Sequence, residues 1–356
     1  MREGSLGTPE GQSRVVAGSF RPPASPPRAR ERMIALALAA LVSVGILALV
    51  ARRPWLAPSD RPNARSLHER PVPRAGGWAV WAGFFAAAPL LPAPPGYAGA
   101  SYATLVVAIA ALFAVSLADD YRGVPAPWRM AVQVAFAVAL AVALVPAVPT
   151  DVVRIGAIAF VLVAATNFYN FMDGSDGLAG AMTVCGFAAL AMGAALDRTA
   201  SFVPLLAIAV AALPFLVRNL PPARVFLGDA GAAPLGFFAA AAGIGGTLAG
   251  TWPAWFPILV FLPFEADAVV TLAWRLARRE RFWEAHRTHY YQRLVRLGAG
   301  HAGTLAAYAA LMVGCGATAV AILALAPAAG PLALAGWAIA IALMFAGIDY
   351  HWRQRA

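Results

Sequence analysis

Oxygen-bearing side chains recur at every third position in the segment Asn167-Phe-Tyr-Asn170-Phe-Met-Asp173-Gly-Ser-Asp176-Gly. On a helix, such a ladder lines one face and drifts by about 60° per step. Hard cations such as Mg²⁺ prefer carboxylate and amide oxygens and complete their shell with water and substrate phosphates. The segment therefore predicts a metal-dependent site, and its glycines predict a break in the helix. The alternative interpretation is a polar helix cap with ordinary turn glycines.

Three further carboxylates lie where apolar runs begin or end. Asp119 and Asp120 close one run, and because neighbouring carboxylates repel, one of them can accept a proton unless a cation neutralises both. Asp229 precedes another run, within the sequence Gly-Asp-Ala-Gly. The simpler interpretations are an acidic helix end for the pair and a helix N-cap for Asp229.

Two basic loops also carry imidazoles. His286, Arg287 and His289 lie in one of them, and His68 and Arg74 lie in the other. Guanidinium groups bind phosphate oxygens in a bidentate manner, so both loops are candidates for holding a phosphate-bearing substrate. A plain excess of arginine in loops on one side of a membrane is the alternative interpretation.

The elements that must position these residues are membrane-spanning helices. The chain has 356 residues, of which 61% are hydrophobic and 12% are charged, far from the soluble average of about a quarter charged. Its apolar runs are continuous blocks near the roughly 20 residues that cross a bilayer, which predicts helices rather than a barrel. We expect eleven spans, at 33–50, 77–91, 101–118, 130–148, 152–168, 177–196, 202–217, 231–248, 252–272, 302–326 and 332–348.

The arginines indicate which side of the membrane carries the polar motifs. With these spans, 19 arginines from residue 52 onward lie in loops or the tail on one side and only Arg154 and Arg198 lie on the other. Short cytoplasmic loops are enriched in basic residues, so the first side is predicted to be cytoplasmic. All the motif carboxylates fall on this side. Inside the span 252–272, Glu265 and Asp267 are expected to be buried structural partners.

The domain organisation is expected to be simple. Residues 1–32 are rich in Pro, Ser and Arg without periodicity, which is typical of a disordered leader, and six arginines there oppose the predicted orientation. Translation that starts at Met33 would remove the conflict. Residues 33–356 are expected to form one membrane-embedded domain.

Together, the motifs resemble those of the polyprenyl-phosphate N-acetylhexosamine-1-phosphate transferases, glycosyl transferase family 4. The resemblance covers nearly everything from Met33 onward. It rests on five ordered motifs: the loop 68–77, Asp119-Asp120 with Gln133 beyond, 167–180, 225–236, and the loop 286–289. It implies an all-α, polytopic enzyme of the bacterial inner (cytoplasmic) membrane. Such an enzyme transfers N-acetylhexosamine 1-phosphate from a UDP-sugar to undecaprenyl phosphate and releases UMP, to start O-antigen or other cell-envelope polysaccharides.

The resemblance also implies roles for individual residues. Asp229 and Asn170 would be ligands of Mg²⁺, with Mn²⁺ as a substitute, and Asp173 would lie close by. Asp119 or Asp120 would deprotonate or position the lipid phosphate, and Asp176 would lie near the uridine. The substrate-binding residues would be His68, Arg74, Asn167, His286, Arg287 and His289. Family members also form homodimers.

Departures from the family pattern leave some alternatives open. Pro127 stands where a Lys is common after the paired aspartates, which leaves Arg122 and Arg129 as the nearby cations. The three consecutive histidines of the phospho-N-acetylmuramoyl-pentapeptide transferases are missing, which favours the O-antigen or teichoic branch. Two alternatives come from other classes. An ion-coupled transporter would place acids near the midplane within repeated halves, and an inactive scaffold would have lost some of the motif acids.

Overall fold

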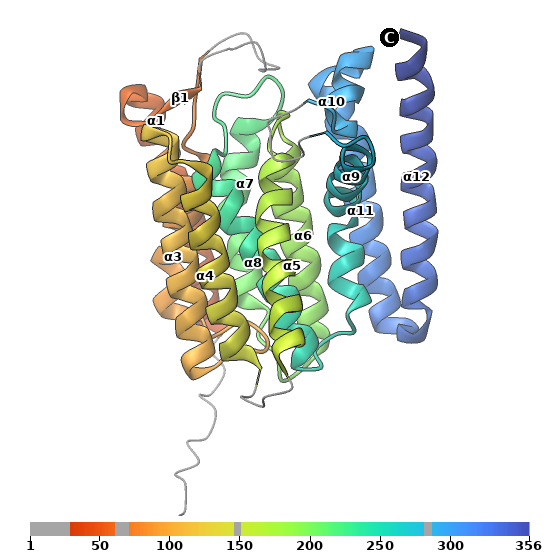
Figure 1. Ribbon diagram of the computed structural model, residues 1–356. Helices are drawn as coiled ribbons and strands as arrows, with labels where there is room; N and C mark the ends of the chain where they lie inside the picture. The colour runs from red at the N-terminus through yellow and green to blue at the C-terminus, as the bar shows by residue number, and fades with distance from the viewer. Residues whose placement is uncertain (1–28, 61–70, 146–150, 281–286, 356) are drawn as a thin grey trace, which may run out of the picture.

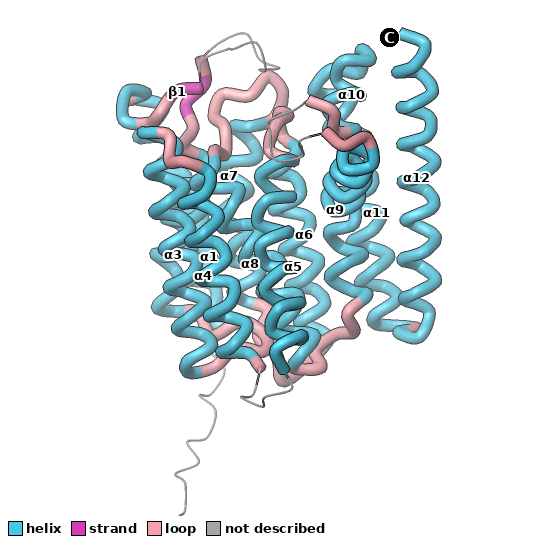
Figure 2. The backbone as a smooth tube through the Cα atoms, viewed as in Figure 1, coloured by secondary structure: helices cyan, strands magenta, loops and turns pink. Residues whose placement is uncertain are grey.

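The computed structural model describes residues 29–60, 71–145, 151–280 and 287–355, which form a bundle of helices with one small strand pair (Figures 1 and 2). The helices are α1 (Ala29–Arg52), α2 (Gly76–Ala87), α3 (Gly99–Arg122), α4 (Ala126–Leu144), α5 (Val152–Phe171), α6 (Leu178–Leu196), α7 (Val203–Asn219), α8 (Asp229–Leu248), α9 (Trp255–Ala277), α10 (Tyr290–Leu294), α11 (Gly300–Leu325) and α12 (Gly330–Arg355). Short 3₁₀ turns lie at Pro54–Leu56, Ala88–Leu90 and Pro327–Ala329, and a π-helical turn at Val295–Ala299 precedes α11.

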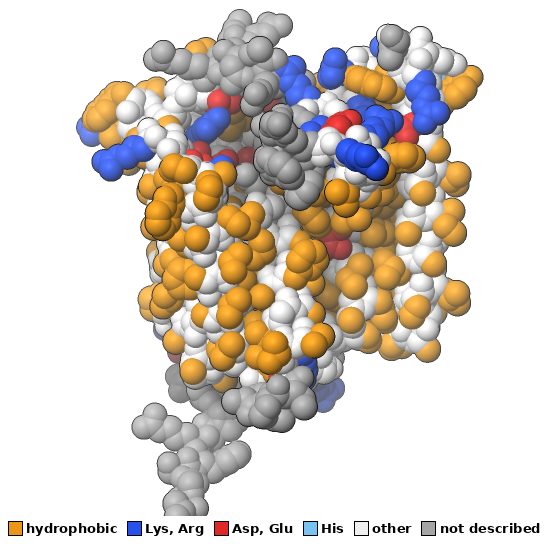
Figure 3. All heavy atoms as spheres, in the orientation of Figure 1, with side chains coloured by type: hydrophobic (Ala, Val, Ile, Leu, Met, Phe, Trp, Pro, Cys, Tyr) orange, Lys and Arg blue, Asp and Glu red, His pale blue; other side chains and the backbone are white. Residues whose placement is uncertain are grey.

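The all-α, polytopic architecture is confirmed, because every predicted apolar run forms a helix in the described residues. Nine of these helical segments are long and apolar enough to cross a membrane, and the segments 76–90 and 203–219 are shorter apolar helices. Hydrophobic side chains cover the side of the bundle, with charged groups towards its ends (Figure 3). Among the described residues, the first helix begins at Ala29, four residues before the predicted start of the first span at Met33. Residues 1–28 lie outside the described part.

The centre of the bundle is built from small residues. α6 and α8 are the most enclosed spans, and both are rich in Ala and Gly, which lets helix backbones approach closely. Gly236 of α8 shows this closeness, because a Cβ there would lie 2.4 Å from the carbonyl oxygen of Ala165 in α5. α8 also packs against α3, so the three helices α3, α5 and α8, which all carry motif residues, lie together.

In the part of the chain that the structure describes, the polar motifs lie at one end of the bundle. The turn between α3 and α4, the turn between α5 and α6, the start of α8, β1 (Ser59–Asp60), β2 (Val72–Pro73), α10 and the end of α12 share this end (Figure 1). Arg154 in the first turn of α5 and Arg198 just after α6 lie at the opposite end. From Arg52 onward the described arginines thus follow the predicted sidedness, whereas Arg30 and Arg32 in the first turn of α1 lie at the opposite end. The assignment of the motif end to the cytoplasm stays a prediction.

Two glycines let the start of α2 dock on the segment that leads into α8. The N–H groups of Gly76 and Gly77 donate to the carbonyls of Phe226 and Leu227, at 2.8 Å each. A Cβ on Gly77 would lie 2.3 Å from the backbone nitrogen of Gly231, so the backbones touch without side chains between them. This contact holds the loop that carries Arg74 beside the first turn of α8.

We expect Gly77→Ala to lower the thermal unfolding midpoint of the purified protein, because the added methyl group collides with backbone that cannot rotate away. Gly45→Ala is the matched control, since a Cβ on Gly45 meets nothing within 4 Å. Differential scanning fluorimetry in detergent compares them. Equal midpoints for the two variants would contradict this account of the docking contact.

Candidate active site

The helix that carries the polar ladder ends inside it. α5 stops at Phe171, and α6 begins at Leu178 after a turn in which Gly177 has φ +77°, a conformation that favours glycine. The N–H of Gly177 donates to the side-chain oxygen of Asn219 at 2.9 Å, which fixes the turn against α7. The predicted break is confirmed, and its consequence is that the four ladder residues do not share one helix face.

Asp120 binds the N-terminus of α8 from another helix. Its carboxylate accepts hydrogen bonds from the N–H groups of Asp229 at 3.3 Å and Ala230 at 3.0 Å, and its side chain is 1% exposed. These N–H groups have no partner within their own helix, and the helix dipole favours an anion beside them. The cap residue of α8 is Gly228, so Asp229 is not the N-cap, and its carboxylate is left for other contacts.

Arg129 joins two of the predicted carboxylates. One terminal nitrogen of its guanidinium, Nη1, contacts the carboxylate of Asp119 and lies 2.9 Å from Oδ2 of Asp229. Asp119 also accepts a hydrogen bond from the N–H of Val124 at 2.6 Å. The paired aspartates therefore differ: Asp120 is committed to the α8 N-terminus, whereas Asp119 and Asp229 share a cation that is partly open to solvent.

A second arginine lies on the other side of the cluster. Arg74 contacts Asp60 at 2.5 Å and lies 3.6 Å from Asp120. Burial lowers the pKa of Arg74, but the carboxylates of Asp60 and Asp120 raise it by more. The guanidinium therefore stays charged. Acidic and basic side chains gather in a hollow at this end of the molecule (Figure 3).

Asp173 extends the negative charge of the cluster. Burial raises its pKa well above the ordinary value, and the nearby carboxylates of Asp229 and Asp120 raise it further. Arg74 and a hydrogen bond from the backbone N–H of Gly228 act in the opposite direction. A bound cation or another positive group beside Asp173 would stabilise its charged form.

The oxygen ligands of the cluster fit a divalent cation whose coordination shell is completed by substrate oxygens. Together with Asp60 beside Arg74, the carboxylates of the cluster outnumber the two guanidinium groups, so negative charge remains to be neutralised when these carboxylates are ionised. The cluster carboxylates are those of Asp119, Asp120, Asp173 and Asp229. Among the described residues, no three His, Cys, Asp or Glu side chains lie close enough together to hold a metal ion by themselves. Mg²⁺ commonly takes only one or two protein carboxylates and fills its shell with phosphate and water, so the two observations are compatible.

Two ladder residues turn away from this cluster. The side-chain amide of Asn167 donates to Gln133 of α4 and to the carbonyl of Val163, both at 2.8 Å. Asp176 accepts a hydrogen bond from the N–H of Ala223 at 2.9 Å. Its Oδ1 also lies 3.7 Å from Nδ1 of His301 in α11. Four of the five motif aspartates thus lie in one cluster, and Asp176 lies in a neighbouring polar network.

The basic loops are only partly described. His68 and His286 lie outside the described residues, whereas Arg287 is half-buried just before α10. His289 is 2% exposed, and its Nδ1 lies 3.2 Å from Oδ1 of Asp267, so it faces the protein interior rather than an open site. The sequence predicted substrate contacts for this histidine because the burial of a loop residue cannot be read from its neighbours.

Asp267 is the anchor of this loop. Its carboxylate accepts hydrogen bonds from the N–H groups of Tyr290 and Tyr291, both at 2.9 Å, and from the hydroxyl of Tyr308 at 2.5 Å. The hydroxyl of Thr271 donates a further bond at 3.1 Å. The side chain is fully buried, which agrees with the structural role expected for it. It ties α10 and α11 to α9.

Removal of one donor from Asp267 should weaken the whole fold. We expect Tyr308→Phe to reduce the free energy of unfolding by about 1–3 kcal/mol, because a buried carboxylate loses a hydrogen bond. Tyr102→Phe serves as the control, since Tyr102 is half-buried and its hydroxyl donates to no described residue. Chemical unfolding in detergent, followed by circular dichroism, measures both. A Tyr308→Phe protein as stable as the control would contradict the anchoring role.

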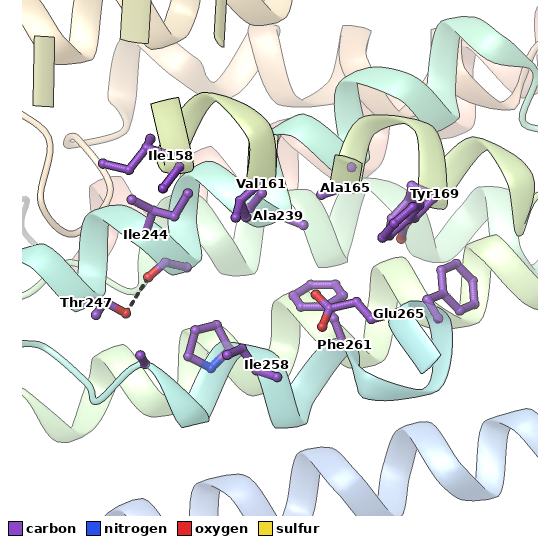
Figure 4. A pocket seen from close by; sticks show the side chains of 18 of the residues that line it. Ile158, Val161, Ala165, Tyr169, Ala239, Ile244, Thr247, Ile258, Phe261 and Glu265 are labelled. Atoms are coloured by element: carbon purple, nitrogen blue, oxygen red, sulfur yellow. Dashed lines mark hydrogen bonds between the residues drawn. The ribbon is translucent and has the colours of Figure 1, made fainter. Parts of the chain in front are cut away.

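An apolar groove leads away from the polar cluster along α5. It has a volume of about 320 Å³ and is lined by α5, α8 and α9, from Arg154 at one end to Phe168 and Tyr169 at the other (Figure 4). Tyr169 immediately precedes Asn170, so the groove ends beside the polar end of α5. Glu265, expected to be a buried structural partner, instead lines this groove near Tyr169 and Phe261.

Sequence reasoning missed three residues of the site. Arg129 was noted only as a nearby cation, and its bridging contact joins residues 100 positions apart. Asp60, the partner of Arg74, lies in the same loop, where the sequence offers two acids, Asp60 and Glu69. His301 is one of just five histidines in the chain, and its place at the start of an apolar run was the available signal.

Comparisons with known proteins agree with this geometry. The sequence profile of glycosyl transferase family 4 matches residues 102–247, which contain Asp119, Asp120, Asp173 and Asp229. Over this segment, which is less than half of the chain, the protein is similar to glycosyl transferase family 4. The matched segment runs from α3 through α8, which carry the four clustered carboxylates and Arg129, whereas Arg74 lies outside it.

Several relatives extend the similarity beyond that segment. The chain is 25% identical over 296 residues to a probable undecaprenyl-phosphate N-acetylglucosaminyl 1-phosphate transferase of Bacillus subtilis, covering 76% of this chain and 80% of the relative. It is 27% identical over 280 residues to a decaprenyl-phosphate N-acetylglucosaminephosphotransferase of Mycolicibacterium smegmatis, covering 67% and 69%. A phospho-N-acetylmuramoyl-pentapeptide-transferase of Trichormus variabilis is 31% identical over 164 residues, covering 38% and 45%.

Proposed function

We propose that this protein belongs to glycosyl transferase family 4 and transfers an N-acetylhexosamine 1-phosphate group from a UDP-sugar to undecaprenyl phosphate at the cytoplasmic face of the inner membrane. A phosphate oxygen of the lipid attacks the β-phosphorus of the UDP-sugar. The bond between that phosphorus and the bridging oxygen breaks, and UMP leaves. The lipid-linked sugar diphosphate then starts an O-antigen or a related cell-envelope polysaccharide.

One observation carries the proposal: an apolar groove follows α5 and reaches Phe168 and Tyr169, directly before Asn170 at the end of the same helix that leads to the carboxylate cluster. A polyprenyl phosphate has the same two parts, a charged head and a long hydrocarbon chain. With its chain along α5 and its phosphate beyond Tyr169, the head reaches the region of Asn170 and Asp173. The names of the relatives, which include polyprenyl-phosphate acceptors, support this assignment.

The residues of the cluster have different proposed roles. Asp120 fixes the first turn of α8, which holds Asp229 in place. Arg74 and Arg129 bind phosphate oxygens, because each guanidinium is partly exposed beside the cluster. Asp119, with its side chain 13% exposed, is better placed than Asp120 to orient or deprotonate the lipid phosphate. Arg287 holds the diphosphate or the sugar.

Mg²⁺ would be held by Asp229, with Asn170 as the second protein ligand. When bound, the cation neutralises charge on the two phosphates that would otherwise repel the anionic lipid. Asp176, together with His301, keeps the turn before α6 in place beside the uridine.

The choice of sugar is tested directly with a panel of donors. Purified protein receives undecaprenyl phosphate, Mg²⁺ and, in separate reactions, UDP-N-acetylglucosamine, its epimers, 6-deoxy analogues and UDP-N-acetylmuramoyl-pentapeptide. We expect UMP release with at least one N-acetylhexosamine donor and none with the pentapeptide donor. Release only with the latter would assign the chain to the muramoyl branch. No UMP from any donor would remove the enzyme assignment and favour a transporter or scaffold.

The groove has its own test. Ala240 lines it and is half-buried, so Ala240→Trp fills the space expected to hold the lipid chain. We expect the KM for undecaprenyl phosphate to rise about tenfold or more, since several methylene contacts are lost, and the KM for the UDP-sugar to stay unchanged. Steady-state kinetics in detergent micelles measure both constants. A proportional change in both would contradict a separate site for the lipid chain.

A further inference from the structure

A second basic pocket lies at the end of α12, apart from the carboxylate cluster. It has a volume of about 290 Å³ and is lined by Arg296, Leu297, Trp352 and Arg355. The π-helical turn before α11 supplies Arg296 and Leu297, and the last turn of α12 supplies the other two residues. The pocket therefore joins two elements that are 58 residues apart in the chain.

Charge in this pocket is unbalanced. The guanidinium of Arg296 lies over the ring of Trp352, 4.8 Å from its centroid, and Arg355 donates to the carbonyl of Leu297 at 2.8 Å. Neither arginine pairs with a carboxylate of the described residues. Asp349 is close in sequence, but its two oxygens are engaged by Arg293 at 2.6 Å and by the hydroxyl of Tyr290 at 3.1 Å.

We infer that this pocket binds the phosphate of an anionic phospholipid headgroup. Two guanidinium groups without a carboxylate recognise a phosphate, and the indole forms an apolar wall beside them. α12 lies at the edge of the bundle, and the exposed Tyr350 and the nearby Trp352 are typical of the membrane interface. Anionic lipids attract basic residues at this depth on the cytoplasmic side.

The bound headgroup holds α10 against α12. Arg293 and Tyr290 already connect the two helices through Asp349, and the pocket lies one turn further along the chain. α10 directly follows the segment that contains Arg287, so anionic lipid strengthens the support of that loop. The inference concerns stability and lipid binding, and it stands whether or not the proposed transferase reaction is correct.

The test compares the full chain in phosphatidylcholine nanodiscs with and without phosphatidylglycerol. We expect phosphatidylglycerol to raise the unfolding midpoint of the wild type, and the double variant Arg296→Gln, Arg355→Gln to lose most of this increase. Native mass spectrometry should show phosphatidylglycerol retention about tenfold weaker for each arginine removed. Arg278→Gln is the matched control, because Arg278 also lies over an indole, that of Trp274 at 5.8 Å, but outside the pocket.

Two outcomes would overturn the inference. A double variant that keeps the full phosphatidylglycerol effect would show that general surface charge, rather than this pocket, is responsible. Inorganic phosphate that raises the midpoint in phosphatidylcholine as much as the lipid does would assign the pocket to a soluble phosphate instead. If the double variant does not fold, Arg296→Gln alone carries the same comparison, since its guanidinium donates to no described carbonyl or carboxylate.

Discussion

Asp229→Asn should reduce UMP release to a small residual rate while the protein still folds. The substitution keeps the size of the side chain and removes the negative charge expected to hold Mg²⁺ beside the diphosphate. We expect kcat to fall by at least about a hundredfold, the scale seen when a charge-stabilising group is lost from an active site. A coupled assay for UMP, with Mg²⁺ varied over a wide range, measures the effect. The residual activity should need higher Mg²⁺ for half-maximal rate.

Asp197→Asn is the matched control for this substitution. Asp197 lies just after α6 at the opposite end of the bundle, where its carboxylate accepts hydrogen bonds from the backbone N–H and the hydroxyl of Thr199. Its variant should retain wild-type kcat and wild-type Mg²⁺ dependence. Full activity of Asp229→Asn would exclude Asp229 from the chemistry and would require another carboxylate to hold the cation.

Arg129→Gln should have the second largest effect on activity. The guanidinium is the contact that joins Asp119 to Asp229, and without it two carboxylates face each other with less positive charge between them. The incoming phosphates also lose a donor. We expect kcat/KM to fall by about a hundredfold, the loss expected when a charge-assisted contact is removed from a low-dielectric site.

Arg129→Lys distinguishes the contribution of the positive charge from that of the planar guanidinium geometry. An ammonium restores the positive charge but cannot present several planar donors, so it should recover part of the activity. Arg122→Gln provides the control, since Arg122 is an exposed residue at the end of the same α3 that carries the paired aspartates. Steady-state kinetics of the three variants give the comparison. Wild-type kcat/KM in Arg129→Gln would show that the bridge is structural only.

The spans could be predicted from the sequence because they depend on one simple quantity, the length of an apolar run. Eleven runs became helices, with ends that differ by a few residues because polar terminal turns such as Tyr290–Leu294 and Asp349–Arg355 continue the helices into the interface. The shared end of the carboxylates also followed from counting spans. The positions of the spans and the side on which each loop lies depend only on the composition and order of the segments.

The contacts of individual side chains could not be predicted from the sequence, because they depend on how the helices pack. The ladder from Asn167 to Asp176 suggested one face, but the helix ends at Phe171, so Asp176 turns towards the segment before α8. Asn167 faces Gln133 because α4 lies against that side of α5. His289 looked like a substrate ligand and is buried, since the carboxylate that holds it comes from the middle of another span.

The fate of the β-phosphorus decides between the proposed reaction and ordinary glycosyl transfer. UDP-N-acetylglucosamine, or the donor that the panel selects, carries a radiolabel on its β-phosphorus alone, and the products are separated into organic and aqueous phases. The account predicts that the label enters the organic phase only when undecaprenyl phosphate is present, while unlabelled UMP forms in equal amount. Label that remains in water as UDP, or as intact donor, would contradict it.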